Sequence, residues 1–338
     1  MDRHDTNGTL EEALERLHSS GPERLGRLTN HAPMVVEALA ARGQAGAVHR
    51  WLDRYRHKLE DFPSPVAPVT DADWPQALGD PRRAADWIAY FTRALSDRPW
   101  REVLATWWPR LLPGMYGGST HPVIRVGHAV RALEREENEP RLTELAHGLG
   151  YWAARHRPVS GIAPLPGAPS AAASLDAVVP LPDPRGGFPD RLAALRHLPR
   201  WADEVTDPGT ARERLAELVR AATHRYASHG HGEPTMLVHA ATAPNAVLRT
   251  LDSLPRALWV PSLHAAWTAT AAVTAMYAPA APVAYAPPAR LTAGEVLERA
   301  LAHGDEHVIK FTDTALDAGD ERALAAAQRA VELSEPLG

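Results

Sequence analysis

Two histidines and one arginine lie on a single stripe of the helix that the sequence predicts after residue 120. Residues 117–133 read GGSTHPVIRVGHAVRAL, so steps of four and three residues separate His121, Arg125 and His128. Such steps place side chains on one helical face. Imidazole binds metals or transfers protons, and guanidinium binds anionic oxygen. Because seven helical residues span about 10 Å, His121 and His128 bind one metal together without strain only if His121 lies outside the regular helix.

Further histidines stand in apolar surroundings. His31 begins a strongly apolar helix in LTNHAPMVVEAL, His239 lies within TMLVHAATAPNAVLRTL, and His264 lies within SLHAAWTATAA. A buried neutral imidazole with one hydrogen bond explains each of them as well as a functional role does. The same interpretation, or a solvated helix face, applies to the stripe of His121 and His128. Local sequence leaves both alternatives open.

A lysine in an apolar segment near the end of the chain suggests more specific chemistry. In HGDEHVIKFTDTAL, His307 and Lys310 are three residues apart and are therefore neighbours on a helix face. Lysine is almost never fully buried unless it is paired, so a salt bridge to a nearby carboxylate is one interpretation. The other is an amine with a depressed pKa, which is a nucleophile. Such an amine also takes up CO2 to form a carbamate, a carboxylate-like oxygen donor for a metal.

Several common kinds of site are absent from the sequence. The chain has no cysteine, which excludes disulfides, thiolate zinc sites, iron–sulfur clusters and cysteine nucleophiles. It has no GxGxxG at a strand–helix turn, no P-loop, no HExxH and no GxSxG. Flavin, nicotinamide and nucleoside triphosphate therefore have no support from motifs.

The elements that must position these residues are helices. Alanine, leucine, arginine and glutamate dominate, apolar residues recur at helical spacing, and no fixed-period repeat is present. We therefore predict an all-α, bundle-like single domain with long connections rich in proline and glycine. The predicted helical segments are 9–20, 32–43, 45–60, 80–100, 101–115, 122–137, 140–159, 190–198, 209–230, 235–251, 261–277, 292–319 and 320–333.

The helical pattern fails between residues 159 and 190, where proline and glycine recur every few positions. We predict an N-terminal helical half over 1–158, a Pro/Gly-rich connection over 159–190 and a C-terminal helical half over 191–338. Both halves are expected to form one domain around a shared site. Connections of this length in compact domains are usually functional or disordered.

Composition narrows the classes of partner. The net charge of −5 argues against a nucleic-acid-binding protein, which usually carries a basic excess. The polar N-terminus does not resemble a signal or transit peptide, so a cytoplasmic location is expected by default. The longest apolar stretch, HAAWTATAAVTAMYAPAAPVAYAPP, is broken by prolines, and we predict a buried helix and no membrane span.

Four segments taken in order resemble the questin oxidase-like family. They are NHAPMVVEAL, GGSTHPVIRVGHAVRAL, LVHAATAPNAVLRTL and GDEHVIKFTDTAL. The resemblance extends from about residue 25 to residue 320. It implies an oxygenase of aromatic polyketide pathways that cleaves an anthraquinone ring with dioxygen. The net outcome is like a Baeyer–Villiger oxidation, or a dioxygenation that gives a benzophenone.

The resemblance also implies a mononuclear non-haem iron centre held by four histidines and an N-carboxylated lysine. Lys310 takes the place of the lysine, and five histidines are candidates for the four imidazole places: His31, His121, His128, His239 and His307. From the spacing given above, His128 or His121 is the expected surplus, whereas His264 and His303 fall outside the set. Imidazole and carboxylate-type oxygen suit iron(II). Arg125 is expected either to orient an anionic oxygen or to form a salt bridge.

The first hypothesis is therefore a metal-dependent oxygenase that oxidises or cleaves a polycyclic, anthraquinone-like substrate with dioxygen. An alternative is a metal-free helical protein that binds a small molecule and uses its histidines for hydrogen bonds. Another is a helical interaction protein in which the histidines have no common role. Metal content discriminates the first hypothesis from the other two.

Overall fold

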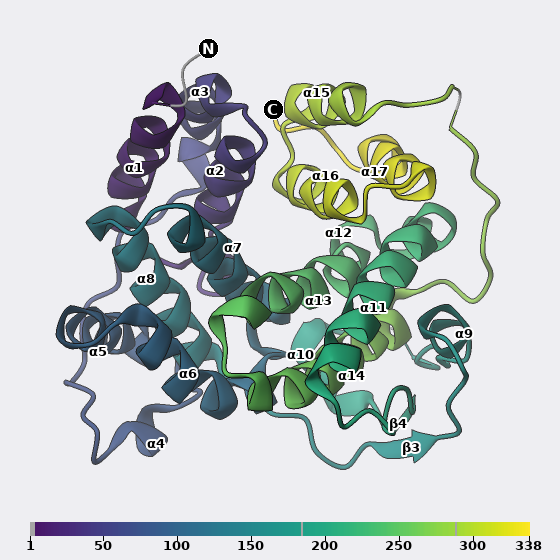
Figure 1. Cartoon of the computed structure of the whole chain (residues 1–338), viewed down its shortest axis with the longest axis horizontal. Helices are drawn as coiled ribbons and strands as arrows, with labels where there is room; N and C mark the ends of the chain where they lie inside the picture. The colour runs from purple at the N-terminus through teal and green to yellow at the C-terminus, as the bar shows by residue number, and fades with distance from the viewer. Residues whose placement is uncertain (1–3, 184, 288) are drawn as a thin grey trace. The chain divides into compact units, whose positions relative to one another are not determined.

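The computed structural model describes residues 4–183, 185–287 and 289–338, and these are organised mainly as helices (Figure 1). Strand within these residues is limited to short segments of two or three residues. The predicted all-α fold class is confirmed. The chain divides into two compact units. Unit 1 comprises Met1–Pro158, Asp252–Pro255 and Gly338, and unit 2 comprises Val159–Leu251 and Arg256–Leu337.

Unit 1 is built from helices and one small antiparallel hairpin, in which β1 (Glu23–Arg24) pairs with β2 (Leu28–Thr29). Its helices are α1 (His4–His18), α2 (Ala32–Ala41), α3 (Ala45–Tyr55), α4 (Trp74–Ala77), α5 (Ala84–Asp97), α6 (Trp100–Leu111), α7 (His121–Arg135) and α8 (Glu139–Arg155).

Packing in unit 1 centres on two helices. Helix α2 packs against α1, α3 and α7, and helix α8 packs against α1, α5 and α7. Large aromatic side chains fill the core and supply much of its buried apolar area. The fully buried tryptophans of this unit are Trp51, Trp87, Trp100, Trp107, Trp108 and Trp152. The contact of α2 with α7 matters for the site, because each of these helices begins at or beside a candidate histidine.

Unit 2 contains a two-stranded parallel pair, β3 (Ala163–Leu165) with β4 (His197–Pro199). Helix α11 packs against α9, α13, α14, α16 and α17, and α13 packs against both α14 and α16. The helices are α9 (Ala171–Asp176), α10 (Phe188–Ala194), α11 (Pro208–His229), α12 (Pro234–Leu237), α13 (His239–Thr250), α14 (Trp259–Tyr277), α15 (Ala293–His303), α16 (Glu306–Ala318) and α17 (Glu321–Leu333).

The segment 292–319, predicted as one helical run, divides into α15 and α16. Gly304 adopts the left-handed conformation (φ 81°) that ends α15. Asp305 then caps α16 by accepting the backbone N–H groups of His307 and Val308, each at 3.0 Å. This break matters because it places His307 in the first turn of a new helix.

The segment 159–190, predicted as a connection, belongs to unit 2 and contains β3, α9 and the start of α10. Helix α9 packs against α11, and Glu217 of α11 accepts the backbone N–H of Ala171 at 2.8 Å. Short elements of this kind are difficult to foresee, because a single helical turn has no amphipathic period to detect.

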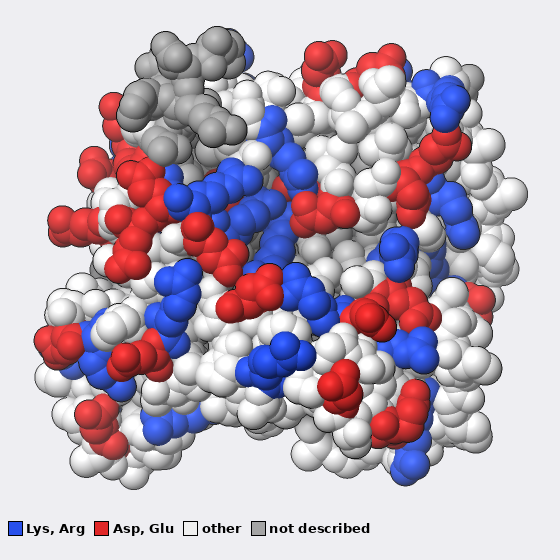
Figure 2. Space-filling model, viewed as in Figure 1, with Lys and Arg blue, Asp and Glu red and all other residues white. Residues whose placement is uncertain are grey.

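Helix α14 contains only the first part of the longest apolar stretch, through Tyr277, and is buried along most of its length, whereas residues 278–287 are not helical and are mostly exposed. In the described part of the chain, no helix combines the length and apolarity needed to cross a bilayer. On the face shown in Figure 2, acidic and basic side chains are interspersed.

Candidate metal centre

Two histidines of unit 1 form a close imidazole pair. His31 immediately precedes α2 and His121 is the first residue of α7, and both side chains are buried. Their Nε2 atoms are 2.8 Å apart and the rings are nearly perpendicular, at 85°. Two nitrogen ligands about 2.0–2.2 Å from one metal, at right angles, lie about 2.8–3.1 Å apart. The 2.8 Å contact is a hydrogen bond between the two imidazoles, and the same spacing would also suit two adjacent ligands of one metal.

A left-handed turn delivers His121 to this pair. Gly118, Ser119 and Thr120 all have positive φ, at 56°, 56° and 66°. The turn brings the carbonyl oxygen of Gly118 to 2.7 Å from His121 Nδ1. A carbonyl only accepts, so Nδ1 carries the proton, and the unprotonated Nε2 of the neutral ring accepts the hydrogen bond from His31 Nε2 at 2.8 Å. This tautomer is the one that binds a metal through Nε2.

The backbone before α2 fixes His31 just as firmly. Its N–H donates to the hydroxyl of Tyr55 at 3.1 Å. The side chain of Asn30 accepts the N–H of Ala32 and donates to the carbonyl of Gly21, both at 3.0 Å. The chain therefore enters α2 in one conformation, with the imidazole turned inward.

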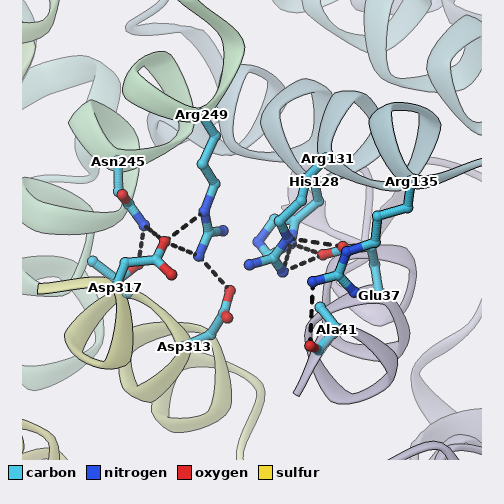
Figure 3. A network of polar contacts seen from close by, with 10 residues as sticks. Glu37, Ala41, His128, Arg131, Arg135, Asn245, Arg249, Asp313 and Asp317 are labelled. Carbon is cyan, nitrogen blue, oxygen red and sulfur yellow. Dashed lines mark hydrogen bonds and ion pairs between the residues drawn. The ribbon is translucent and has the colours of Figure 1, made fainter. Parts of the chain in front are cut away.

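His128 is bound by a carboxylate in unit 1. His128 Nδ1 lies 2.6 Å from Glu37 Oε2, and Arg131 also binds both oxygens of Glu37 (Figure 3). Burial alone would raise the pKa of Glu37. The charge of Arg131 and the contact with His128 outweigh this effect and lower the pKa to about 2. Among the described residues, His128 does not form a three-membered metal-binding group with His31 and His121.

Arg125 forms a two-pronged ion pair with Glu144 of α8. Arg125 Nε lies 2.5 Å from Glu144 Oε1, and its terminal nitrogen lies 2.8 Å from Oε2. Both side chains are buried. Of the two roles open to Arg125 from the sequence, the geometry shows the salt bridge. A role toward an anionic oxygen of a ligand stays a prediction.

Unit 2 holds a second buried group, formed by His239, His307 and Lys310. His239 begins α13, and the carbonyl of Met236 accepts its Nδ1–H at 3.0 Å, so its Nε2 is unprotonated in the neutral ring. The rings of His239 and His307 are 5.6 Å apart between centroids. Burial lowers the pKa of His239 well below its usual value, and the charges of Lys310 and His307 lower it further.

Lys310 is the least ordinary member of this group. Its side chain is 1% exposed, and its Nζ makes no hydrogen bond to any described residue. Burial lowers its pKa to about 7, although the negative charges of Glu306 and Asp305 oppose that shift. An ammonium in such a place would carry a large desolvation cost. A substantial fraction of neutral amine at physiological pH follows.

Side-chain hydrogen bonds connect α13 to α16. They fix the position of His239 relative to His307 and Lys310. Arg249 donates to Asp313 and to Asp317, both at 2.8 Å, and Asn245 donates to Asp317 at 2.9 Å (Figure 3). These four residues lie on later turns of the same two helices that carry the imidazoles and the amine. Slippage of one helix past the other would break all three hydrogen bonds.

The remaining histidines discussed above bind main-chain carbonyls. His264 Nε2 lies 3.2 Å from the oxygen of Ala202, and His303 Nε2 lies 3.0 Å from the oxygen of Ser334. Asp305, Glu306 and His307 also offer ligand atoms within 4.8 Å of one another. One oxygen of Asp305 is already the cap of α16, which makes it a poor competitor for a metal.

Sequence reasoning missed two buried residues, of which Glu37 binds the His128 imidazole and Tyr151 contacts Thr29, two residues before His31. Glu37 and Tyr151 were not singled out, because their partners are 91 and 122 residues away in the chain. Glu37 did leave a trace, since it is the one charged residue in the apolar run APMVVEALAA. An isolated charge on a buried helix face predicts a buried partner.

The buried imidazoles and the buried lysine on this all-α scaffold are groups of a kind that could bind a metal ion. The chain belongs to the Questin oxidase-like family, whose model matches residues 28–314. No curated protein matches the chain. Family membership implies an oxygenase, and thus an oxidoreductase that acts on a small-molecule substrate and dioxygen.

Proposed function

We propose that this chain is a non-haem iron oxygenase that cleaves or oxidises a polycyclic, anthraquinone-like substrate, with a net outcome like a Baeyer–Villiger oxidation. The iron ligands proposed are His31, His121, His239, His307 and Lys310, the last as an N-carboxylated side chain. His128 is then the surplus imidazole. When bound, iron supplies the activation of dioxygen.

The observation that carries this proposal is the state of the imidazole nitrogens. His121 and His239 each donate Nδ1–H to a main-chain carbonyl, at 2.7 Å and 3.0 Å. Each therefore presents an unprotonated Nε2 while buried, which is how metal-ligating histidines are commonly held.

The amine of Lys310 suits the role of a carbamate precursor. Its neutral form attacks CO2 at carbon; the new N–C bond leaves a carbamic acid, which loses a proton to become an anionic oxygen donor. An aliphatic, buried setting favours the neutral amine before reaction. A bound cation then stabilises the negative charge, so carboxylation and metal binding support each other.

The rest of the chain supplies orientation and exclusion of water. Glu37 forms an ion pair with Arg131 and also binds His128. Glu144 forms an ion pair with Arg125, so both of these arginines of α7 are paired with a carboxylate.

Metal analysis of protein purified without a polyhistidine tag tests the proposal. We expect iron in a one-to-one ratio to the chain, and its loss in both His121→Ala and His239→Ala. His264→Ala is the matched control, because it removes an imidazole that binds a backbone carbonyl outside the proposed set. Absence of bound metal after anaerobic iron loading would contradict the proposal and favour a metal-free small-molecule binding protein.

A further inference from the structure

One tyrosine touches both segments that carry the histidine pair of unit 1. Tyr151 of α8 is buried, and its hydroxyl lies 2.8 Å from Thr29 Oγ1, two residues before His31. The same hydroxyl donates to Glu23 Oε1 at 3.1 Å. A phenolic hydroxyl has one proton to give, so Thr29 donates to Tyr151 and Tyr151 donates to Glu23.

The other side of this hydroxyl meets the turn that precedes His121. A Cβ placed on Gly118 would lie 3.1 Å from the Tyr151 oxygen. A Cβ on Gly117 would lie 1.5 Å from the carbonyl oxygen of Arg155, so the turn also rests on the last turn of α8. The left-handed turn therefore packs against the C-terminal end of α8.

The carboxylate of Glu23 completes the arrangement. Arg155 Nε donates to Glu23 Oε1 at 2.5 Å, and a second guanidinium nitrogen binds Oε2. Burial raises the pKa of the Tyr151 hydroxyl, and the negative charge of Glu23 raises it further, so the hydroxyl stays protonated. A fixed donor direction runs from Thr29 through Tyr151 to Glu23.

We propose that Tyr151 is a positioning residue that sets the spacing of the His31 and His121 imidazoles for metal binding. The inference rests on the proposed function, because it gives a purpose to the 2.8 Å separation of the two Nε2 atoms. Tyr151 acts through the segments Thr29–His31 and Gly118–His121 and touches neither imidazole in this role.

Tyr151→Phe removes the hydroxyl and keeps the ring. Loss of a group that orients metal ligands typically lowers metal affinity by about 10- to 100-fold. We expect a loss in this range in competition titrations of Co(II) against a chelator, with the visible Co(II) spectrum altered. Tyr90→Phe is the matched control, because Tyr90 is also buried in unit 1 and donates to Asp71 at 2.6 Å, but it contacts neither histidine segment. Equal losses of affinity in the two variants would overturn the proposal.

Thr29 separates positioning from general stability. Thr29→Val should reproduce the loss of metal affinity, whereas Thr29→Ser keeps the hydroxyl and should bind metal like the wild type. The double variant Thr29→Val/Tyr151→Phe should lose little more affinity than either single variant. Additive losses would show that the two hydroxyls act independently, against the proposal.

A readout in the metal-free protein distinguishes failure of this inference from failure of the proposed function. Nitrogen-15 spectra of the imidazoles report the tautomer and mobility of His31 and His121. Altered signals for these two rings in Tyr151→Phe, with Tyr90→Phe like the wild type, support positioning even if the wild type binds no metal. Unchanged imidazole signals in Tyr151→Phe contradict it.

Discussion

Gly150 of α8 lies directly against the main chain of Ile88 in α5. A Cβ on Gly150 would come within 2.7 Å of the Ile88 backbone nitrogen and 2.9 Å of its Cα. The two helices therefore approach at a point where only glycine fits, and backbone atoms cannot move aside as a flexible side chain can.

We expect Gly150→Ala to destabilise the protein by about 1–3 kcal/mol, the usual range for overpacking a core. Alanine gains about 1 kcal/mol over glycine in helix propensity, which offsets only part of that loss. Gly148→Ala, two residues earlier, is the control. Its Cβ would meet Val126 Cγ2 at 3.2 Å, a side-chain atom that can shift. Chemical denaturation measures both, and equal stabilities for the two variants would refute the argument.

The conformation of Gly118 leads to an expectation for the turn before α7. Its φ of 56° is unfavourable for a residue with a Cβ, by about 1–2 kcal/mol, and the added carbon would press on Tyr151. We expect Gly118→Ala to lose both stability and metal affinity. Gly43→Ala has a similar φ of 74° but open space around it, so it should lose stability alone. A Gly118→Ala protein that bound metal like the wild type would contradict the role given to the turn.

Breaking the carboxylate of Glu37 should be costly. Glu37→Gln leaves Arg131 and His128 without their anionic partner, and loss of one member of a buried pair typically costs about 3–5 kcal/mol. The folded-state pKa of Glu37 lies at about 2, below its usual value of 4.5. Its stabilising effect is thus full above pH 4.5 and is lost as the pH falls toward 2. Denaturation of wild type and Glu37→Gln across this interval should show their difference in stability shrink with acidification.

Lys310 gives a pH dependence of the same sign in the metal-free protein, but at higher pH and for a different reason, because burial destabilises its charged form. Its folded-state pKa of about 7 lies below the usual 10.5, so the unfolded chain binds more protons between those values. Stability of the wild type should therefore rise as the pH increases from 7 toward 10.5, by at most about 1.4 kcal/mol per pH unit. Lys310→Met removes this slope. Parallel stability curves for the two proteins would show that Lys310 is not a desolvated amine.

The metal-loaded protein tests the carbamate directly. We expect carbon-13 bicarbonate to give a carbamate signal in the wild type that is absent from Lys310→Met. That variant should remain helical, lose most of its metal and have no oxygenase activity, whereas Lys310→Glu keeps an oxygen donor and should retain part of the metal. Wild-type metal content and turnover in Lys310→Met would exclude lysine as a ligand.

The long helices of this fold could be predicted from sequence, whereas the breaks between helices and the shortest helices could not. Helical spacing indicated α7 and α11, and α14 was indicated by its long run of apolar and small residues, which is buried on nearly all sides. The division of 292–319 depends on Gly304 in the left-handed conformation and on Asp305 as the cap of α16. Glycine and aspartate also occur within continuous helices, so these two residues alone do not predict the break. Helix α9 has too few residues to show a period, so its sequence does not differ from that of a connection.

The site shows a similar division. The residue types of His121 and Lys310 were conspicuous in apolar surroundings, so sequence reasoning selected them. What holds them depends on long-range contacts, such as Tyr151 with Thr29, that no local pattern contains. The left-handed residues Ser119 and Thr120 are also unforeseeable, since neither type normally favours that conformation.

The tautomers of His121 and His239 are set by carbonyl groups of the main chain, at Gly118 and Met236. Every amino acid has the same main-chain carbonyl group. Replacement of the Met236 side chain therefore leaves this hydrogen-bond acceptor in place. Changes of the Met236 side chain can therefore reshape the surface near His239 without altering which of its nitrogens is protonated. The arrangement separates the evolution of specificity from the preservation of ligand chemistry.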